Sequence, residues 1–239
     1  MKKSILKGVF YLLATFLLTA LLVIIISLFG SERTIFGYLL LILCYQIPWL
    51  MVLLFEGKSF LKKELVWNKK DQRFLLLIFC FALVFYLIEG LLHNLSIDGS
   101  NFGLGFLEAI LFGSFAQLGW RGYFQNFLEA YLGKKDRFFI YFFIALIETV
   151  WYVLLMNLAW HMESLPFFVL FIYLCGHSFC MGWIKDLTKS SIPVVFYHFI
   201  FRCLSYFLVL QFHIFTSLFI AALQILIVFF LQRQFTKVD

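Results

Sequence analysis

The sequence predicts an all-α fold, that of a polytopic helical membrane protein with about eight transmembrane helices. Of its 239 residues, 64% are hydrophobic and 13% are charged, with a mean hydropathy of +0.98. This composition excludes a water-soluble domain. Several apolar runs also reach the roughly 20 residues that a helix needs to cross the hydrocarbon core of a bilayer. Helices satisfy their backbone hydrogen bonds internally, so runs of this length favour spanning helices.

Eight apolar runs follow one another along the chain, separated by short polar or glycine-containing connections. Each one is long enough, or nearly so, to cross a bilayer as a helix. A count of seven remains open, with the last run lying in the membrane interface instead of crossing it. The predicted spans are residues 9–29, 36–55, 74–93, 104–120, 138–160, 167–183, 192–210 and 215–231.

Lysine and arginine fall in every second connection between these runs. Basic residues accumulate on the cytoplasmic side of membrane proteins, so the alternation predicts eight spans with both termini in the cytoplasm of a cell-membrane protein. Only Arg33 lies on the opposite side. The net charge of +6 therefore indicates topology and contact with membrane lipids rather than nucleic-acid binding. The predicted cytoplasmic set is Lys2, Lys3, Lys7, Lys58, Lys62, Lys63, Lys69, Lys70, Arg73, Lys134, Lys135, Arg137, Lys185, Lys189, Arg233 and Lys237.

Three segments are predicted along the chain. Residues 1–101 hold the first three spans and a basic amphipathic stretch, 57–73. Residues 102–208 form a central membrane core, and residues 209–239 form the last span with a cytoplasmic tail. The basic stretch alternates lysines with Phe60, Leu61, Leu65 and Trp67, which is typical of a short helix lying in the headgroup layer.

Polar side chains at membrane depth need a partner or a water-filled cavity. Gln117 and Arg121 stand four residues apart on one predicted helix, and His198 and Arg202 repeat that spacing on another. Two interpretations stay open, namely ordinary hydrogen bonds between helices and a shared polar pocket. We expect Arg121 to pair with Gln117 or with a nearby backbone carbonyl. Further candidates are Glu89, His93, Glu108, Glu148, Asn157 and His177.

Three blocks of the central core resemble the CAAX-protease and bacteriocin-processing family, also called the Abi family. The first block, residues 116–123, reads Ala-Gln-Leu-Gly-Trp-Arg-Gly-Tyr, where the family has two glutamates, three residues and then an arginine. The second runs from Trp151 to Leu155, where the family has an aromatic residue and, four positions later, histidine. The third begins at Gly182-Trp183 and continues to His198 and Arg202, where the family has histidine followed by asparagine or aspartate.

The resemblance implies a helical membrane core with a cavity reached from the cytoplasm. In active members, glutamate and histidine activate a water that cleaves a peptide bond, while histidine and asparagine support the oxyanion. This chain keeps Arg121 and His198. It has Ala116 and Gln117 at the two glutamate positions, Leu155 at the histidine position and Arg202 at the asparagine position. Glutamine and leucine cannot accept a proton as a general base does, so hydrolysis by the family mechanism should be negligible.

These replacements favour a catalytically degenerate member that acts as a membrane binding, immunity or regulatory protein for a peptide or another membrane protein. The alternative is an active intramembrane endopeptidase that uses Glu148 or Glu108 as a shifted base. A transporter or channel subunit is a third possibility, but no inverted repeat supports it. We predict no cofactor, and no metal either, since His177 and His198 lack the third ligand that catalytic zinc usually has.

Overall fold

The computed structural model describes residues 2–29, 35–66, 80, 83–84, 87–88, 106–107, 109–133, 136–159, 167–207 and 214–235. Every element in these ranges is helical, which confirms the predicted all-α class. The elements are α1 (Lys2–Phe29), α2 (Ile35–Glu56), α3 (Lys58–Glu64), the π-helical segments η2 (Ile110–Ser114) and η3 (Leu118–Phe124), α6 (Gln125–Leu132), α7 (Arg137–Ala159), α8 (Phe167–Thr188), α9 (Ile192–Phe207) and α10 (Ile214–Phe235).

Within the described ranges, four helices are long and apolar enough to cross a membrane. They cover Ile5–Phe29, Ile35–Glu56, Arg137–Leu155 and Phe167–Thr188, which correspond to the predicted first, second, fifth and sixth spans. Ile192–Cys203 and Ser217–Phe230 are shorter apolar helices at the predicted seventh and eighth. Most of the predicted third span, 74–93, lies outside the described residues, as do the predicted segment boundaries near residues 101 and 209.

Large apolar side chains point outward from the long helices. Leu17 on α1 is 68% exposed, Leu54 on α2 75% and Phe168 on α8 70%. Water-soluble monomers rarely leave apolar patches of this extent uncovered, whereas lipid tails cover such faces without cost. The exposed faces therefore agree with the length and composition of the helices, and the fold fits a membrane protein.

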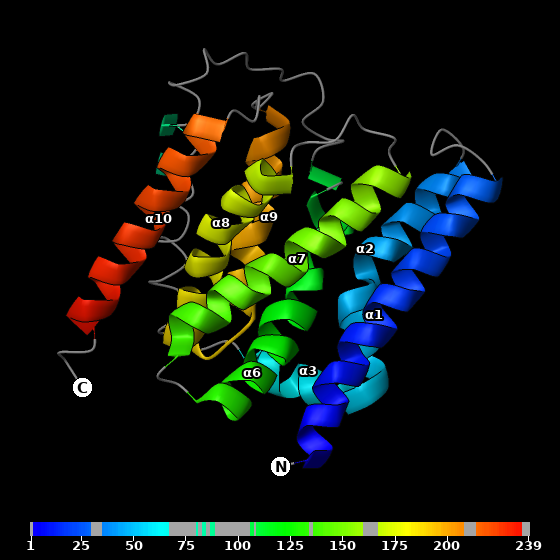
Figure 1. The fold of residues 1–239 in the computed structure, drawn as a ribbon, viewed down its shortest axis with the longest axis horizontal. Coiled ribbons are helices and arrows are strands. Elements are labelled where there is room, and N and C mark those ends of the chain that lie inside the picture. Colours follow the sequence, from blue (N-terminus) through cyan, green and yellow to red (C-terminus); the bar gives the residue numbers. More distant parts are fainter. Residues whose placement is uncertain are drawn as a thin grey trace.

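α8 is the centre of the helix arrangement. It packs against α7, α9 and α10, while α1 packs against α2 and α7 on the other side of the molecule (Figure 1). A continuous apolar core fills the space between α1, α2, η3 and α7, and includes Tyr11, Leu41, Trp120 and Trp151. The Trp151 indole also donates to the Thr19 hydroxyl at 3.1 Å, which fixes α7 against α1.

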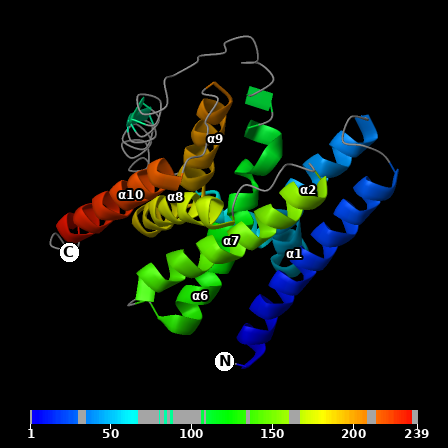
Figure 2. The ribbon, with the colours of Figure 1, turned by 45° about the horizontal axis from the view of Figure 1, so that its top comes forward.

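One end of the molecule gathers the chain segments that are polar. The N-terminal end of α1, helices α3 and α6, the α8–α9 connection and the C-terminal end of α10 all lie on the lower side of Figure 1, which we call the basal end, and the turned view of Figure 2 keeps the N-terminal end of α1 beside α6. Two contacts tie this end together. Lys7 pairs with Glu56 at 3.3 Å, and the Ser191 amide donates to the Glu64 carbonyl at 3.0 Å.

Candidate functional site

A buried ion pair lies at the centre of the molecule. Arg121 on η3 donates from Nη2 to Oε2 of Glu148 on α7 at 2.6 Å, and the two side chains are 0% and 1% exposed. Gln117, one turn before Arg121, donates from Nε2 to Oε1 of the same carboxylate at 2.9 Å. Both oxygens of Glu148 therefore accept a hydrogen bond from η3 or the residue that precedes it.

Helix α8 also contributes a hydrogen bond to this ion pair. Arg121 Nη2 also donates to the Ser178 hydroxyl at 2.9 Å, and Ser178 donates in turn to the Tyr141 carbonyl at 2.5 Å. A buried charge is costly unless an opposite charge and hydrogen bonds compensate it. The pair thus locks η3, α7 and α8 in one arrangement.

The expected pairing of Arg121 with Gln117 or a backbone carbonyl is wrong. Gln117 binds Glu148 instead, beside Arg121. The reason is electrostatic, because a guanidinium removed from water gains much more from a carboxylate than from a neutral amide. The i, i+4 spacing placed Gln117 and Arg121 on one helix face, but it could not identify Glu148 on another helix as the partner of both.

The local shape of η3 brings Arg121 to this position. Residues Leu118–Phe124 form a π-helix, and the Gln125 amide bonds to the Trp120 carbonyl across the widened turn. Gly119 lies against α2 so closely that an added Cβ would come within 2.5 Å of the Pro48 carbonyl carbon and oxygen. π-helical turns are rare and often lie at functional sites. Here the wide turn and the missing side chain let η3 approach α2 while Arg121 faces α7 and α8.

Two family-like positions form part of the apolar core. Ala116 and Leu155 are fully buried among core residues, so neither side chain offers a group for chemistry. Arg202 instead contacts α7 through Tyr152, donating to its hydroxyl at 3.3 Å and lying 5.6 Å from the ring centroid. The second and third sequence blocks are therefore adjacent at Tyr152 and Arg202.

The two histidines lie on neighbouring helices, α8 and α9, near the ion pair. His198 is buried within electrostatic range of Arg202, His177 and Arg121. His177 Nδ1 shares a 3.0 Å hydrogen bond with the Tyr197 hydroxyl, and its ring lies 3.7 Å from that of Phe201. Among the described residues, His198 Nδ1 and His177 Nε2 have no hydrogen-bond partner.

The structure brings together some of the candidate residues and not others. Gln117, Arg121 and Glu148 form one cluster, and His198 lies beside it. Ala116 and Leu155 face the core, while Arg202 is engaged with Tyr152. Glu108, Glu89 and His93 lie outside the described residues, as does the side chain of Asn157. Within the described ranges, no three His, Cys, Asp or Glu side chains are grouped as a metal site would need.

A second polar cluster at the basal end was missed by the sequence reasoning. Glu64 at the end of α3 accepts from Lys185 Nζ, from Ser191 Oγ at 2.6 Å and from Asn126 Nδ2 at 2.9 Å. Its side chain is buried, as is that of Lys185. Glu64 belongs to the stretch 57–73, whose place in the headgroup layer stays a prediction, and its side chain docks into the protein against the buried Lys185. Lys185 likewise belongs to α8 and not to an exposed loop.

One sequence signal could have pointed to this second cluster. Glu64 follows Phe60 by four residues and so shares its helix face. An acidic residue on the apolar face of a basic amphipathic helix needs a partner inside the protein. The spacing does not reveal that the partner is Lys185.

Asp186 joins the ends of α6, α7 and α8 beside this cluster. It accepts from the Tyr141 hydroxyl at 2.5 Å and pairs with Arg137 Nε at 3.2 Å, while Gln125 donates to it at 3.3 Å. Glu129, which belongs to α6, lies next to Asp186 of α8. Burial raises the pKa of Glu129 and the neighbouring Asp186 raises it further, while a hydrogen bond from Gln125 acts in the opposite direction.

The central cluster is better suited to holding helices together than to catalysis. A general base needs a free lone pair directed at a water or substrate proton. Both oxygens of Glu148 already accept hydrogen bonds, and the side chain is 1% exposed. Comparison with known proteins adds no relative: no protein-family model matches this chain, and no curated protein matches it at a significant level.

Proposed function

We propose that this chain is a multi-pass membrane binding protein, a catalytically degenerate relative of the CAAX-protease and bacteriocin-processing family. In this proposal it has eight spans with both termini in the cytoplasm, and its central core holds a peptide or another membrane protein without cleaving it. The observation that supports it most is the enclosed Arg121–Glu148–Gln117 cluster. Among the described residues, the carboxylate paired with the family-like arginine is that of Glu148, which is 1% exposed and accepts a hydrogen bond at each oxygen.

The proximity of the three sequence blocks supports the proposed relationship. Arg121 of the first block meets the helix of the second block at Glu148, and Tyr152 of that helix meets Arg202 of the third block. Of the positions at which the family carries its reactive groups, Ala116 and Leu155 are buried apolar residues. Contact between the three blocks, with apolar residues at two of the reactive positions, supports a degenerate relative.

An active endopeptidase with Glu148 as a shifted base is the second candidate. One observation favours it, since Glu148 adjoins Arg121 and His198 lies within electrostatic range of that arginine. The Glu148 side chain is 1% exposed, so a water would reach it only after the cluster opens. Opening at the ion pair would leave Arg121 uncompensated in the interior, at a cost of about 3–5 kcal/mol. This cost makes the binding role the better supported of the two.

The deciding experiment uses the full chain reconstituted in lipid with prenylated and leader-type peptides that carry a photo-crosslinker. We expect saturable crosslinking to η3, α7, α8 or α9 and no cleavage products. Glu148→Gln, Glu108→Gln and His198→Ala variants are run in parallel. Cleavage that one of these variants abolishes, in a folded and monodisperse preparation, would establish the endopeptidase. Crosslinking that does not saturate for any peptide would contradict a peptide-binding role.

A further inference from the structure

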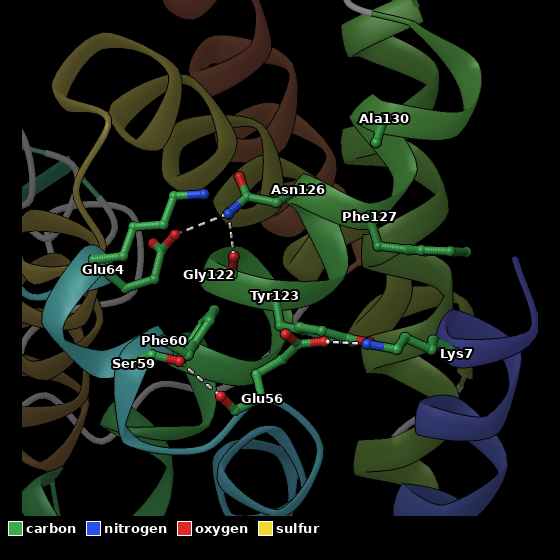
Figure 3. A pocket seen from close by; sticks show the side chains of 11 residues that line it. Lys7, Glu56, Ser59, Phe60, Glu64, Gly122, Tyr123, Asn126, Phe127 and Ala130 are labelled. Carbon is green, nitrogen blue, oxygen red and sulfur yellow. Dashed lines mark hydrogen bonds and ion pairs between the residues drawn. The ribbon is translucent and has the colours of Figure 1, made fainter. Parts of the chain in front are cut away.

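The basal end contains a cavity that is separate from the Arg121–Glu148 cluster. Its volume is about 750 Å³, and residues of α1, α2, α3, η3 and α6 line it (Figure 3). Ligand-binding pockets commonly have volumes of about 300–1,000 Å³. The lining residues are Lys7, Glu56, Ser59, Phe60, Lys63, Glu64, Gly122, Tyr123, Asn126, Phe127 and Ala130.

Four charged residues line the cavity, namely Lys7, Lys63, Glu56 and Glu64. Lys7 and Glu56 form one ion pair, as Figure 3 shows, and Glu64 pairs with the buried Lys185 behind the wall. Lys63 forms no ion pair with any other described residue. Its ammonium is therefore the lining charge that a bound anion could compensate.

A smaller cavity lies beside the first. It has a volume of about 230 Å³ and shares Lys63, Glu64 and Asn126 with the larger cavity. Lys185 and Lys189 also line it. Of its acidic residues, Glu64 is paired with Lys185 and Asp186 with Arg137, while Glu129 interacts electrostatically with Lys185 and Lys189. At this junction Lys63 is again a lysine without an ion pair among the described residues.

The rest of the large cavity is apolar and aromatic. Phe60 and Tyr123 lie edge to face with ring centroids 6.2 Å apart, and Phe127 and Ala130 of α6 complete the wall. Aromatic rings next to basic side chains, at the end of membrane-spanning helices, are typical of the bilayer interface. A free phosphate ion would leave these rings without a partner, whereas the glycerol and upper acyl chain of a lipid would cover them.

We propose that this cavity binds an anionic phospholipid, with its phosphate beside Lys63 and its glycerol backbone against Phe60, Tyr123 and Phe127. A zwitterionic lipid fits less well. It would bring an ammonium group close to Lys63, and the two carboxylates that line the larger cavity, Glu56 and Glu64, already have lysine partners. Basic pockets on the cytoplasmic side of membrane proteins bind lipid headgroups in the same way.

The test measures which lipid stays with the purified full-length chain. The protein is reconstituted in vesicles of phosphatidylglycerol and phosphatidylcholine in equal amounts, extracted in detergent, washed and analysed by mass spectrometry. We expect phosphatidylglycerol to be enriched over phosphatidylcholine. One lysine near a phosphate contributes about 1 kcal/mol, so Lys63→Gln should reduce the retained phosphatidylglycerol roughly fivefold.

Two further variants separate the cavity from general surface charge. Lys62→Gln removes an exposed lysine of the same helix that does not line the cavity, and we expect retention to stay unchanged. Ala130→Trp fills the cavity from an exposed position without changing charge, and retention should fall as with Lys63→Gln. Equal losses in Lys62→Gln and Lys63→Gln, or equal retention of the two lipids, would overturn the proposal.

Inorganic phosphate added to the wash distinguishes the lipid from a free anion. We expect phosphate at millimolar concentration to leave the bound lipid in place, because it cannot replace the contacts to the aromatic wall. Displacement by phosphate would assign the site to a free anion and contradict the lipid. No peptide and no cleavage enters these measurements, so the result is independent of the proposed function.

Discussion

Arg121 is the residue whose environment explains most of the central site. Its Nη2 atom donates hydrogen bonds to both Glu148 and Ser178, while Nε and Nη1 have no hydrogen-bond partner among the described residues. The guanidinium therefore depends on a single carboxylate for its charge compensation. Removing that carboxylate should cost far more than removing an exposed ion pair.

Substitution of Glu148 tests this dependence. We expect Glu148→Gln to lower the free energy of unfolding in detergent by about 3–5 kcal/mol, since it strands the buried Arg121 charge. The double variant Arg121→Met/Glu148→Gln should recover much of the loss because no charge is left unpaired. Lys7→Gln, which breaks the exposed pair with Glu56, serves as control and should change stability by less than about 1 kcal/mol. A double variant no more stable than Glu148→Gln alone would contradict this account.

Glu129 gives the molecule a stability component that depends on pH. Its folded-state pKa is raised by burial, so between the ordinary glutamate pKa of 4.5 and the folded value the folded chain binds more protons than the unfolded chain. This component is fully present below about pH 4.5 and is lost as pH rises through the folded pKa. We expect Glu129→Gln to melt at a higher temperature than the wild type at pH 8, and the difference to vanish at pH 4.

The exposed Asp136 supplies the comparison for Glu129. Asp136→Asn changes an exposed acidic residue at the same end of the molecule and should melt at the wild-type temperature at pH 8. A pH profile of Glu129→Gln that runs parallel to the wild-type profile would show that Glu129 does not contribute.

At the scale of the helices, η3 and α2 approach each other closely, backbone against backbone, at Gly119. Gly119→Ala places a Cβ against the Pro48 backbone, which cannot rotate away as a side chain would. We expect a loss of about 3 kcal/mol, the upper end for overpacking, measured as thermal unfolding in detergent. Gly57→Ala measures backbone strain alone, because its Cβ would meet open space. At φ 68° and ψ −168°, a region used almost only by glycine, that strain costs about 1–3 kcal/mol. A loss below about 1 kcal/mol in Gly119→Ala would contradict the close approach.

Apolar run length predicted the long helices, because a spanning helix needs an uninterrupted stretch of apolar residues. The helices α2, α7 and α8 begin within one residue of their predicted spans. Helix α1 begins seven residues before the predicted residue 9. The partners inside the site could not be predicted in this way. Arg121 and Glu148 are 27 residues apart and lie on different elements, so the pairing depends on how the helices pack. The π-helical turn of η3 also leaves no periodic signal that an i, i+4 pattern would detect.

For the molecule as a whole, the proposed topology agrees with the arrangement of the described helix ends. The N-terminal end of α1 and the C-terminal end of α10 share the basal end with α3 and α6 (Figure 1). Of these segments, α1, α3 and α10 carry basic residues here, namely Lys2, Lys3, Lys7, Lys58, Lys62, Lys63 and Arg233. Positive charge favours the cytoplasmic side, so the basal end should face the cytoplasm.

Single cysteines in a cysteine-free background test the orientation. Asp136 is an exposed residue just before α7 at the basal end, and Ile35 is 84% exposed at the start of α2, at the opposite end of that helix from α3. We expect an impermeant maleimide to label Ile35→Cys in intact cells and Asp136→Cys only after permeabilisation. Labelling of both positions from the same side of the membrane would refute the proposed topology.

The cluster around Glu64 also constrains how the chain is made. Glu64 and Lys185 are 121 positions apart in the chain, so the glutamate leaves the ribosome long before its partner exists. Until α8 and α9 have been inserted, the Glu64 carboxylate has no partner in the protein and stays hydrated. Hydration of this carboxylate keeps α3 undocked from the assembled bundle. Closure of α3 onto Ser191 and Lys185 is therefore a late step of biogenesis. Chains truncated before α8 should remain open at the basal end and be recognised by membrane quality-control proteases.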